Sequence, residues 1–255
     1  MFCIALQSGS NGNCIYVESG DTRLLFDAGI SGSRAEERLA EFGRDIRSVD
    51  ALIISHDHAD HVRCAGIFQR KFHLPVYVTE ATFDAALRRC DLGTLTDVRH
   101  FRPGDTLSFD GVAVETVPTP HDGADGAAFV VSNARRRLGI LTDLGHVFDG
   151  LGPVLASLDA VLLESNYDPE MLEVGPYPHT VKQRIRGPGG HLSNVEAAEL
   201  LLHAASPRLR WACLSHLSET NNSPDLALAT HRTILAGGPT LYAASRRQAT
   251  PLPKV

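Results

Sequence analysis

The sequence lacks the features of membrane-inserted and secreted proteins. It contains no apolar run of about 20 residues, the length that a membrane-spanning helix requires. Its first residues, MFCIALQSGS, lack the basic start and the long apolar segment of a secretion signal. The five cysteines include no CxxC pair, and an odd number does not suit a complete disulfide framework. We therefore expect a cytoplasmic protein with reduced thiols and no membrane contact.

An excess of positive charge is also missing. The chain has 24 lysines and arginines against 30 aspartates and glutamates, which gives a formal net charge of −6. A site for nucleic acid would therefore have to be a local basic cleft. No Ser/Pro-rich linker and no repeat divides the 255 residues. The sequence predicts a single domain over residues 1–255, with a frayed tail at residues 245–255.

Short runs rich in branched apolar residues recur along the chain, bounded by Gly, Asp or Pro, as is typical of strands. Helix signals lie between and after these runs, and the candidate N-caps are Ser33, Ser193 and Ser223. This pattern favours an α/β fold with two stacked sheets and helices outside. The predicted strands are residues 2–6, 14–18, 23–27, 51–55, 75–79, 112–117, 127–131, 138–143, 160–164 and 211–215.

The segment SHDHADHV, residues 55–62, follows the apolar run ALII and is rich in metal-binding side chains. Imidazole and carboxylate ligands this close together suit a divalent ion such as zinc or manganese. In an extended segment His56 and His58 point the same way, whereas a helix that starts near residue 59 would turn Asp60 and His61 toward a neighbouring point. That geometry can serve two metals. Asp57 is expected to be a solvated or turn residue.

Three isolated residues end other predicted strands. His121 follows VETVPTP, Asp143 ends LGILTD and His216 follows WACLS. Each of them alone is typical of a turn or cap residue. Together with the cluster at residues 56–61 they form a candidate ligand set.

The order of these residues, HxHxDH followed by a separated His, Asp and His, resembles the signature of the metallo-β-lactamase-fold hydrolases over nearly the whole chain. The resemblance implies a four-layer αββα sandwich that binds two divalent metal ions, zinc or manganese, at one sheet edge. It also implies metal-bound hydroxide as the nucleophile. The implied ligands are His56, His58 and His121 for one ion, Asp60, His61 and His216 for the other, and Asp143 as a bridge between the ions.

Glu164 and His191 are the candidates for acid catalysis. Glu164 ends the strand AVLLE, and His191 directly precedes a capped helix. A carboxylate can orient a histidine and keep it protonated for departure of the leaving oxygen. The pair resembles one in the RNase Z branch of the family. The alternative is a helix-capping histidine beside a salt-bridged glutamate. With Asp60, these two residues make up the predicted catalytic set.

A basic run between these two residues is a candidate contact for phosphate groups. Lys182, Arg184 and Arg186 lie within five residues of one another. A solvated helix face is the alternative for this run. The Gly/Ser/Asn turn near the N-terminus and the start of the helix after His191 offer further donors. The predicted phosphate contacts are Ser8, Ser10, Asn11, Lys182, Arg184, Arg186, Ser193 and Asn194.

Several segments narrow the resemblance to one branch. QSGSNGNC, ESNYDPEML, KQRIRGPGGHLSN and SHLSETNNSPDLA resemble the YycJ/WalJ-type branch, which implies a 5′ to 3′ DNA exonuclease acting on single-stranded DNA or DNA ends. The segment between Asp143 and His216 leaves no room for a β-CASP insertion. Two alternatives stay open. One is a small-molecule metallohydrolase for a thioester, lactone or cyclic phosphodiester, and the other is a catalytically silent nucleic-acid-binding module.

Overall fold

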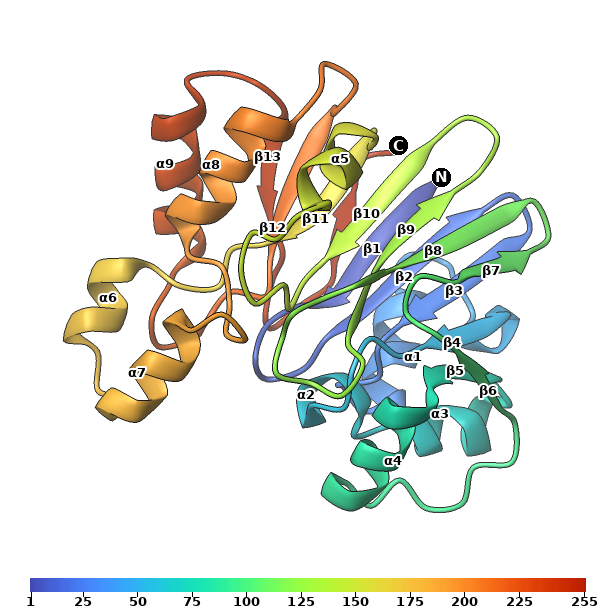
Figure 1. Cartoon of the computed structure of the whole chain (residues 1–255). Coiled ribbons are helices and arrows are strands. Elements are labelled where there is room, and N and C mark those ends of the chain that lie inside the picture. Colours follow the sequence, from blue (N-terminus) through green and yellow to red (C-terminus); the bar gives the residue numbers. More distant parts are fainter. The chain divides into compact units, whose positions relative to one another are not determined.

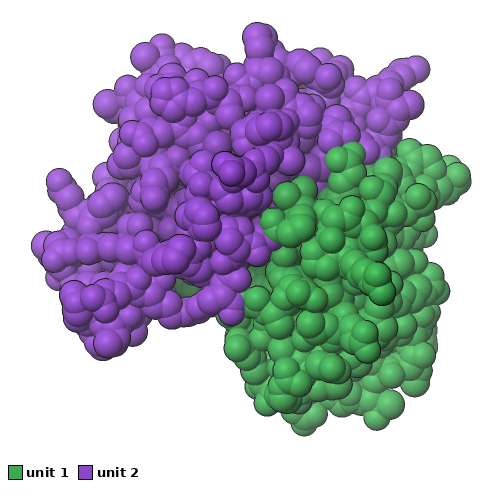
Figure 2. Space-filling view, viewed as in Figure 1, with its two compact units in different colours: residues 1–118, 123–127, 245–254 green, residues 119–122, 128–244, 255 purple.

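The computed structural model describes residues 1–255, and the chain divides into two compact units. Unit 1 comprises Met1–Pro118, Gly123–Ala127 and Ser245–Lys254, and unit 2 comprises Thr119–Asp122, Ala128–Ala244 and Val255 (Figure 2). Neither unit is a continuous stretch of sequence, because the chain passes between them several times. The single domain over residues 1–255 stays a prediction.

The sheet of unit 1 is mixed, with the strand order β14-β1-β2-β3-β4-β5-β6 (Figure 1). The pairs from β14 to β3 are antiparallel and those from β3 to β6 are parallel. Two further strands, β7 and β8, form an antiparallel hairpin. The strands are β1 (Phe2–Gln7), β2 (Cys14–Ser19), β3 (Thr22–Phe26), β4 (Ala51–Ile53), β5 (Val76–Thr79), β6 (Val98–Phe101), β7 (Thr106–Phe109), β8 (Val112–Pro118) and β14 (Thr250–Leu252).

Helices connect the parallel strands of unit 1, as parallel pairing requires. A core of fully buried side chains, among them Tyr16, Leu25, Leu52 and Phe68, joins sheet and helices. The first helix is capped by Ser31, whose side chain accepts from the backbone N–H of Arg34, so the predicted cap at Ser33 is wrong by two residues. The helices are α1 (Gly32–Ala40), a 3-10 turn (Ile46–Ser48), α2 (Ala59–Val62), α3 (Ala65–Phe72) and α4 (Glu80–Arg89).

Unit 2 contains five strands in the order β13-β12-β11-β10-β9. Strands β10 to β13 pair in parallel, whereas β9 and β10 form an antiparallel hairpin. Three parallel neighbours therefore end at the same edge, where they position the residues described below. The strands are β9 (Ala127–Ser132), β10 (Arg137–Leu141), β11 (Ala160–Glu164), β12 (Trp211–Ser215) and β13 (Thr240–Ala243).

The helices of unit 2 include two whose start the sequence predicts. Ser193 and Glu196 form a complete capping box at α8, and Ser223 caps α9 with Pro224 in its first turn. Helices α8 and α9 pack against each other (Figure 1). The helices are α5 (Leu151–Ala156), α6 (Pro169–Val174), α7 (His179–Arg186), α8 (Asn194–Ala204) and α9 (Pro224–Leu235).

The predicted frayed tail at residues 245–255 is wrong, because this segment contains strand β14. Cys3 pairs with Leu252 and Ala5 with Thr250. Leu252 is buried, so the segment gains both a strand partner and an apolar contact. No helix of the chain combines the length and the apolar character needed to cross a bilayer.

Candidate metal centre

The ligand cluster of unit 1 follows the buried strand β4. His58 is the N-cap of the short helix α2, and Asp60 and His61 lie within that helix. The ring centroid of His56 is 4.6 Å from that of His58 and 4.1 Å from that of His61. The predicted change from extended chain to helix after residue 58 is therefore confirmed, and it gathers three imidazoles at the end of one strand.

A carboxylate that the sequence analysis does not single out fixes the ring of His61. Asp27, which follows β3, has its Oδ2 2.7 Å from Nδ1 of His61. The same carboxylate accepts from the backbone N–H and the hydroxyl of Ser55 at 2.8 and 3.0 Å. A carboxylate on Nδ1 holds the proton there and leaves Nε2 as the basic nitrogen, the arrangement typical of metal-binding histidines. Asp27 adopts a left-handed φ of 64°, which an aspartate tolerates better than most residues.

Asp57 lies inside the motif but turns its carboxylate to structural partners. Its Oδ1 accepts from the backbone N–H of Ala124 at 2.8 Å, and its Oδ2 lies 3.0 Å from Nε of Arg89. The side chain is fully buried. It therefore ties the segment Gly123–Ala127 to the chain near β4, and the expectation of a solvated or turn residue is wrong, because both partners of the buried carboxylate are distant in sequence.

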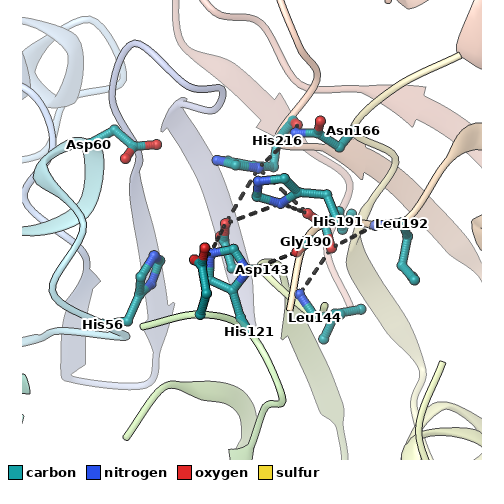
Figure 3. Close-up of polar contacts among 12 residues, drawn as sticks. His56, Asp60, His121, Asp143, Leu144, Asn166, Gly190, His191, Leu192 and His216 are labelled. Atoms are coloured by element: carbon teal, nitrogen blue, oxygen red, sulfur yellow. Dashed lines mark hydrogen bonds and ion pairs between the residues drawn. The ribbon is translucent and has the colours of Figure 1, made fainter. Parts of the chain in front are cut away.

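The cluster of unit 2 lies at the carboxyl ends of β10, β11 and β12. Asp143 follows β10, Glu164 ends β11 and His216 follows β12, so parallel pairing brings them to one edge. Figure 3 labels Asp143 and His216 at this edge. One potential ligand atom from each of these residues and from His191 lies within 4.8 Å of the others. Asp143 and His216 both have left-handed φ values of 56°, which turn the chain sharply after each strand.

Asp143 lies among three histidines of unit 2 (Figure 3). Its Oδ1 is 3.5 Å from Nδ1 of His216, 3.7 Å from Nε2 of His121 and 3.7 Å from Nδ1 of His191. The Nδ1 of His121 is 2.8 Å from the carbonyl oxygen of Gly190, which fixes the proton on Nδ1 and directs Nε2 toward Asp143. Imidazoles around a buried carboxylate form a donor set that suits a divalent cation.

Glu164 and His191 form the short pair that the sequence predicts. Oε1 of Glu164 is 2.6 Å from Nδ1 of His191, and Oε2 accepts from the backbone N–H groups of Leu144 and Leu192 at 2.9 and 3.4 Å. Burial by itself would raise the pKa of the Glu164 carboxyl, but the charge and hydrogen bond of His191, together with His216, hold that pKa well below its usual range. Glu164 is therefore an ionised carboxylate that orients His191, whose side chain is partly exposed.

The basic run Lys182–Arg186 lies on helix α7, and its arginines already have carboxylate partners. Arg184 binds Asp122 through two hydrogen bonds of 2.6 and 3.0 Å. Arg186 lies 2.5 Å from a carboxylate oxygen of Glu173. Lys182 donates to the backbone carbonyl of Glu173. The contact of these residues with phosphate stays a prediction, and two of the three would have to exchange a carboxylate for it.

The remaining predicted phosphate contacts fall into two groups. Ser193 and Asn194 are buried, and their side chains serve the start of α8 and a hydrogen-bond network with Ser165 and Asn222. Ser8 is buried as well. Ser10 and Asn11 are exposed at the turn between β1 and β2, where a ligand can reach them.

Comparisons with known proteins identify the family of the chain. Residues 8–172 match the family model described as the metallo-beta-lactamase superfamily. The chain is 36% identical over 224 residues to exodeoxyribonuclease YycJ of Bacillus anthracis, covering 87% of this chain and 84% of the relative. It is 35% identical over 227 residues to exodeoxyribonuclease WalJ of Streptococcus pneumoniae, covering 88% and 84%.

A solved structure shows the same fold. The metallo-beta-lactamase fold protein YhfI of Bacillus subtilis superposes with a TM-score of 0.74 at 18% identity, covering 98% of this chain and 99% of YhfI. The predicted αββα fold class and the prediction of a metal-dependent hydrolase are thereby confirmed. The chain belongs to the metallo-β-lactamase superfamily, in the branch that contains YycJ and WalJ.

Proposed function

We propose that the chain binds two divalent metal ions, zinc or manganese, and is a DNA exonuclease that degrades single-stranded DNA or DNA ends from 5′ to 3′. The ligand assignment follows the order of residues typical of the family. His56, His58 and His121 would hold one ion, Asp60, His61 and His216 would hold the other, and Asp143 would serve both. The donor sets in both units, three imidazoles in one and imidazoles around a carboxylate in the other, fit such ions chemically.

The observation that carries the proposed reaction is the Glu164–His191 pair. A metal pair supplies an activated water and stabilises the oxygen charge that develops when a phosphodiester is hydrolysed. His191 donates a proton to the departing oxygen of the DNA strand. Glu164 accepts the hydrogen bond from Nδ1 of His191 at 2.6 Å, so the opposite ring nitrogen is the one that can reach the leaving group. Purely structural metal sites do not require such an acid.

DNA as the substrate is proposed from the relatives. Both YycJ and WalJ are called exodeoxyribonucleases, and each is matched over more than four fifths of its length. All five cysteines are free thiols, which agrees with a reducing compartment, and we propose the cytoplasm as the place of action.

The test is cleavage of single-stranded DNA that carries a label at the 5′ or the 3′ end, with zinc or manganese added and the metal content measured on the same sample. We expect early release of the 5′ label as a mononucleotide and progressive shortening of the 3′-labelled strand. Early release of the 3′ label would reverse the proposed polarity. Intact DNA with two metals bound would refute the nuclease and direct attention to thioesters, lactones and cyclic phosphodiesters.

A further inference from the structure

Arg63 of unit 1 carries a positive charge that no carboxylate neutralises. Its side chain is exposed, its Nε donates to the carbonyl oxygen of Gly29 at 2.8 Å, and its Nη2 donates to the carbonyl oxygen of Asn11 at 2.6 Å. A carbonyl oxygen carries only a partial charge, so these contacts fix the guanidinium without cancelling its charge. Because the residue is exposed, the guanidinium N–H groups that do not serve these carbonyls can donate to an anion.

This distinguishes Arg63 from the two arginines of the basic run on helix α7. Arg184 and Arg186 are each held by a carboxylate, Asp122 and Glu173 respectively. To bind phosphate, either arginine would have to give up an existing charge pair. Arg63 gains a charge partner when phosphate binds and loses none, so the balance of electrostatic free energy favours Arg63 as the phosphate contact.

The turn beside Arg63 offers backbone donors as well. The N–H of Gly12 donates to the carbonyl oxygen of Gly9 at 2.9 Å, which closes a β-turn with Ser10 and Asn11 at its tip. The backbone N–H groups of Ser10 and Asn11 donate to no protein group, and both residues are exposed. Backbone N–H groups are common partners of phosphate oxygens in complexes with nucleic acids.

The same turn is tied to the predicted metal ligands of unit 1 through Asn13. The backbone N–H of Asn13 donates to the carbonyl oxygen of Asp60 at 2.8 Å, and its side-chain amide lies 3.2 Å from Oδ2 of Asp60 and 2.9 Å from Nε2 of His61. Arg63 itself follows His61 by two residues. A phosphate held by the turn and Arg63 would therefore lie next to the ligand cluster.

We infer that Arg63 and the turn tip at Ser10 and Asn11 form a binding site for a backbone phosphate of the DNA strand, next to the phosphodiester that is cleaved. This inference rests on the proposed nuclease function and names the contact that holds the polymer. It places Arg63 ahead of Arg184 and Arg186 of α7 as the cationic contact. The expected ligand is a phosphodiester of a single strand, recognised without regard to base sequence.

The experiment measures binding of the metal-loaded protein to a short fluorescent single-stranded DNA whose terminal linkages are phosphorothioates, so that it resists cleavage. Arg63→Gln should weaken binding about tenfold at low salt and should reduce the slope of log Kd against log salt concentration by about 0.7, the value for one phosphate contact on a single strand. Arg63→Lys keeps the charge and should keep the slope. Arg47→Gln is the matched control, because Arg47 is an exposed arginine of the same unit that pairs with Glu36.

A second variant leaves the carbonyl contacts of Arg63 in place. Asn11→Asp puts a negative charge at the turn tip and should weaken binding at least as much as Arg63→Gln, whereas Asn133→Asp, in the hairpin turn between β9 and β10, should not. An unchanged salt slope in Arg63→Gln together with unchanged affinity in Asn11→Asp would overturn the inference while wild-type cleavage of DNA still upholds the nuclease. A wild-type protein that neither binds nor cleaves DNA would overturn both.

Discussion

Asn166 holds His216 at two points. Its side-chain amide nitrogen lies 2.8 Å from the carbonyl oxygen of His216 and 3.2 Å from the Nδ1 of its ring. The backbone carbonyl of Asn166 in turn accepts from the side-chain amide of Asn222 at 3.0 Å. Asn222 exchanges two hydrogen bonds, of 2.8 and 3.0 Å, with the buried side chain of Asn194. The ring of His216 is thus oriented by a buried chain of amides.

Asn166→Ala should lower metal affinity about 10- to 100-fold, the usual effect of removing a group that orients a ligand. The measurement is competition with a chelator of known affinity, carried out on the folded protein. Asn133→Ala, which removes a half-buried asparagine from the hairpin turn between β9 and β10, is the control. Equal affinity of Asn166→Ala and the wild type would contradict the positioning role.

His191→Ala should keep both metals and lose turnover by a factor of about 10²–10⁴, the typical contribution of a positioned general acid. Metal analysis and DNA cleavage on one preparation separate the two effects. Loss of metal together with activity would instead identify His191 as a ligand, which its position near Asp143 makes chemically possible.

Asp27→Asn should weaken metal binding by the unit 1 cluster, because the amide cannot hold the Nδ1 proton of His61 as a carboxylate does. We expect roughly 10-fold weaker affinity for one of the two ions, visible as two separated steps in a metal titration. Asp57→Asn is the comparison within the same unit, since Asp57 binds Ala124 and Arg89 and contacts no predicted ligand through its carboxylate. A single unshifted step for Asp27→Asn would refute the assignment.

His231 should make the protein acid-sensitive. The residue is fully buried in α9, its Nδ1 lies 2.9 Å from the carbonyl oxygen of Ala227, and its Nε2 has no partner. Burial lowers the pKa of His231 from its ordinary value of 6.5 to about 4. Between these two pH values the unfolded chain binds a proton at His231 that the folded chain does not. The contribution of neutral His231 to the free energy of unfolding is therefore fully present above pH 6.5 and decreases as the pH drops toward 4.

The measurement for this prediction is chemical denaturation of wild type and His231→Leu at pH 7 and pH 5. The wild type should lose about 2 kcal/mol more unfolding free energy than the variant over this interval, at about 1.36 kcal/mol per unit of pKa difference. His203→Gln, at an exposed position of α8, should behave as the wild type. An identical pH dependence in His231→Leu would show that His231 is not the responsible group.

The sequence predicts those site residues that lie at the ends of predicted strands or within the HxHxDH motif. Asp143, Glu164 and His216 follow from one rule, because the carboxyl ends of parallel strands meet at one edge. Asp27 satisfies the same rule at the end of residues 23–27, but it carries no motif of its own and is absent from the predicted set.

The contacts of amide and arginine side chains could not be predicted in this way. Asn166 and Asn222 are 56 positions apart, and the Arg184–Asp122 pair spans 62 positions. Their partners are fixed by the three-dimensional fold and leave no local pattern. For the same reason, a count of charges along the sequence favours Arg184 as the phosphate contact. The hydrogen-bond acceptors around each guanidinium in the folded chain favour Arg63 instead.

Strand β14 has a consequence for the order in which the protein can fold during synthesis. It pairs with β1, although it is synthesised after all the other strands of residues 1–255. Until residues 250–252 emerge, β1 presents one edge with unpaired N–H and C=O groups, which can pair with a second nascent chain. The sheet that carries the HxHxDH cluster is therefore complete only after residues 250–252 have been synthesised. A stalled or shortened chain would keep that edge open and be prone to association through it.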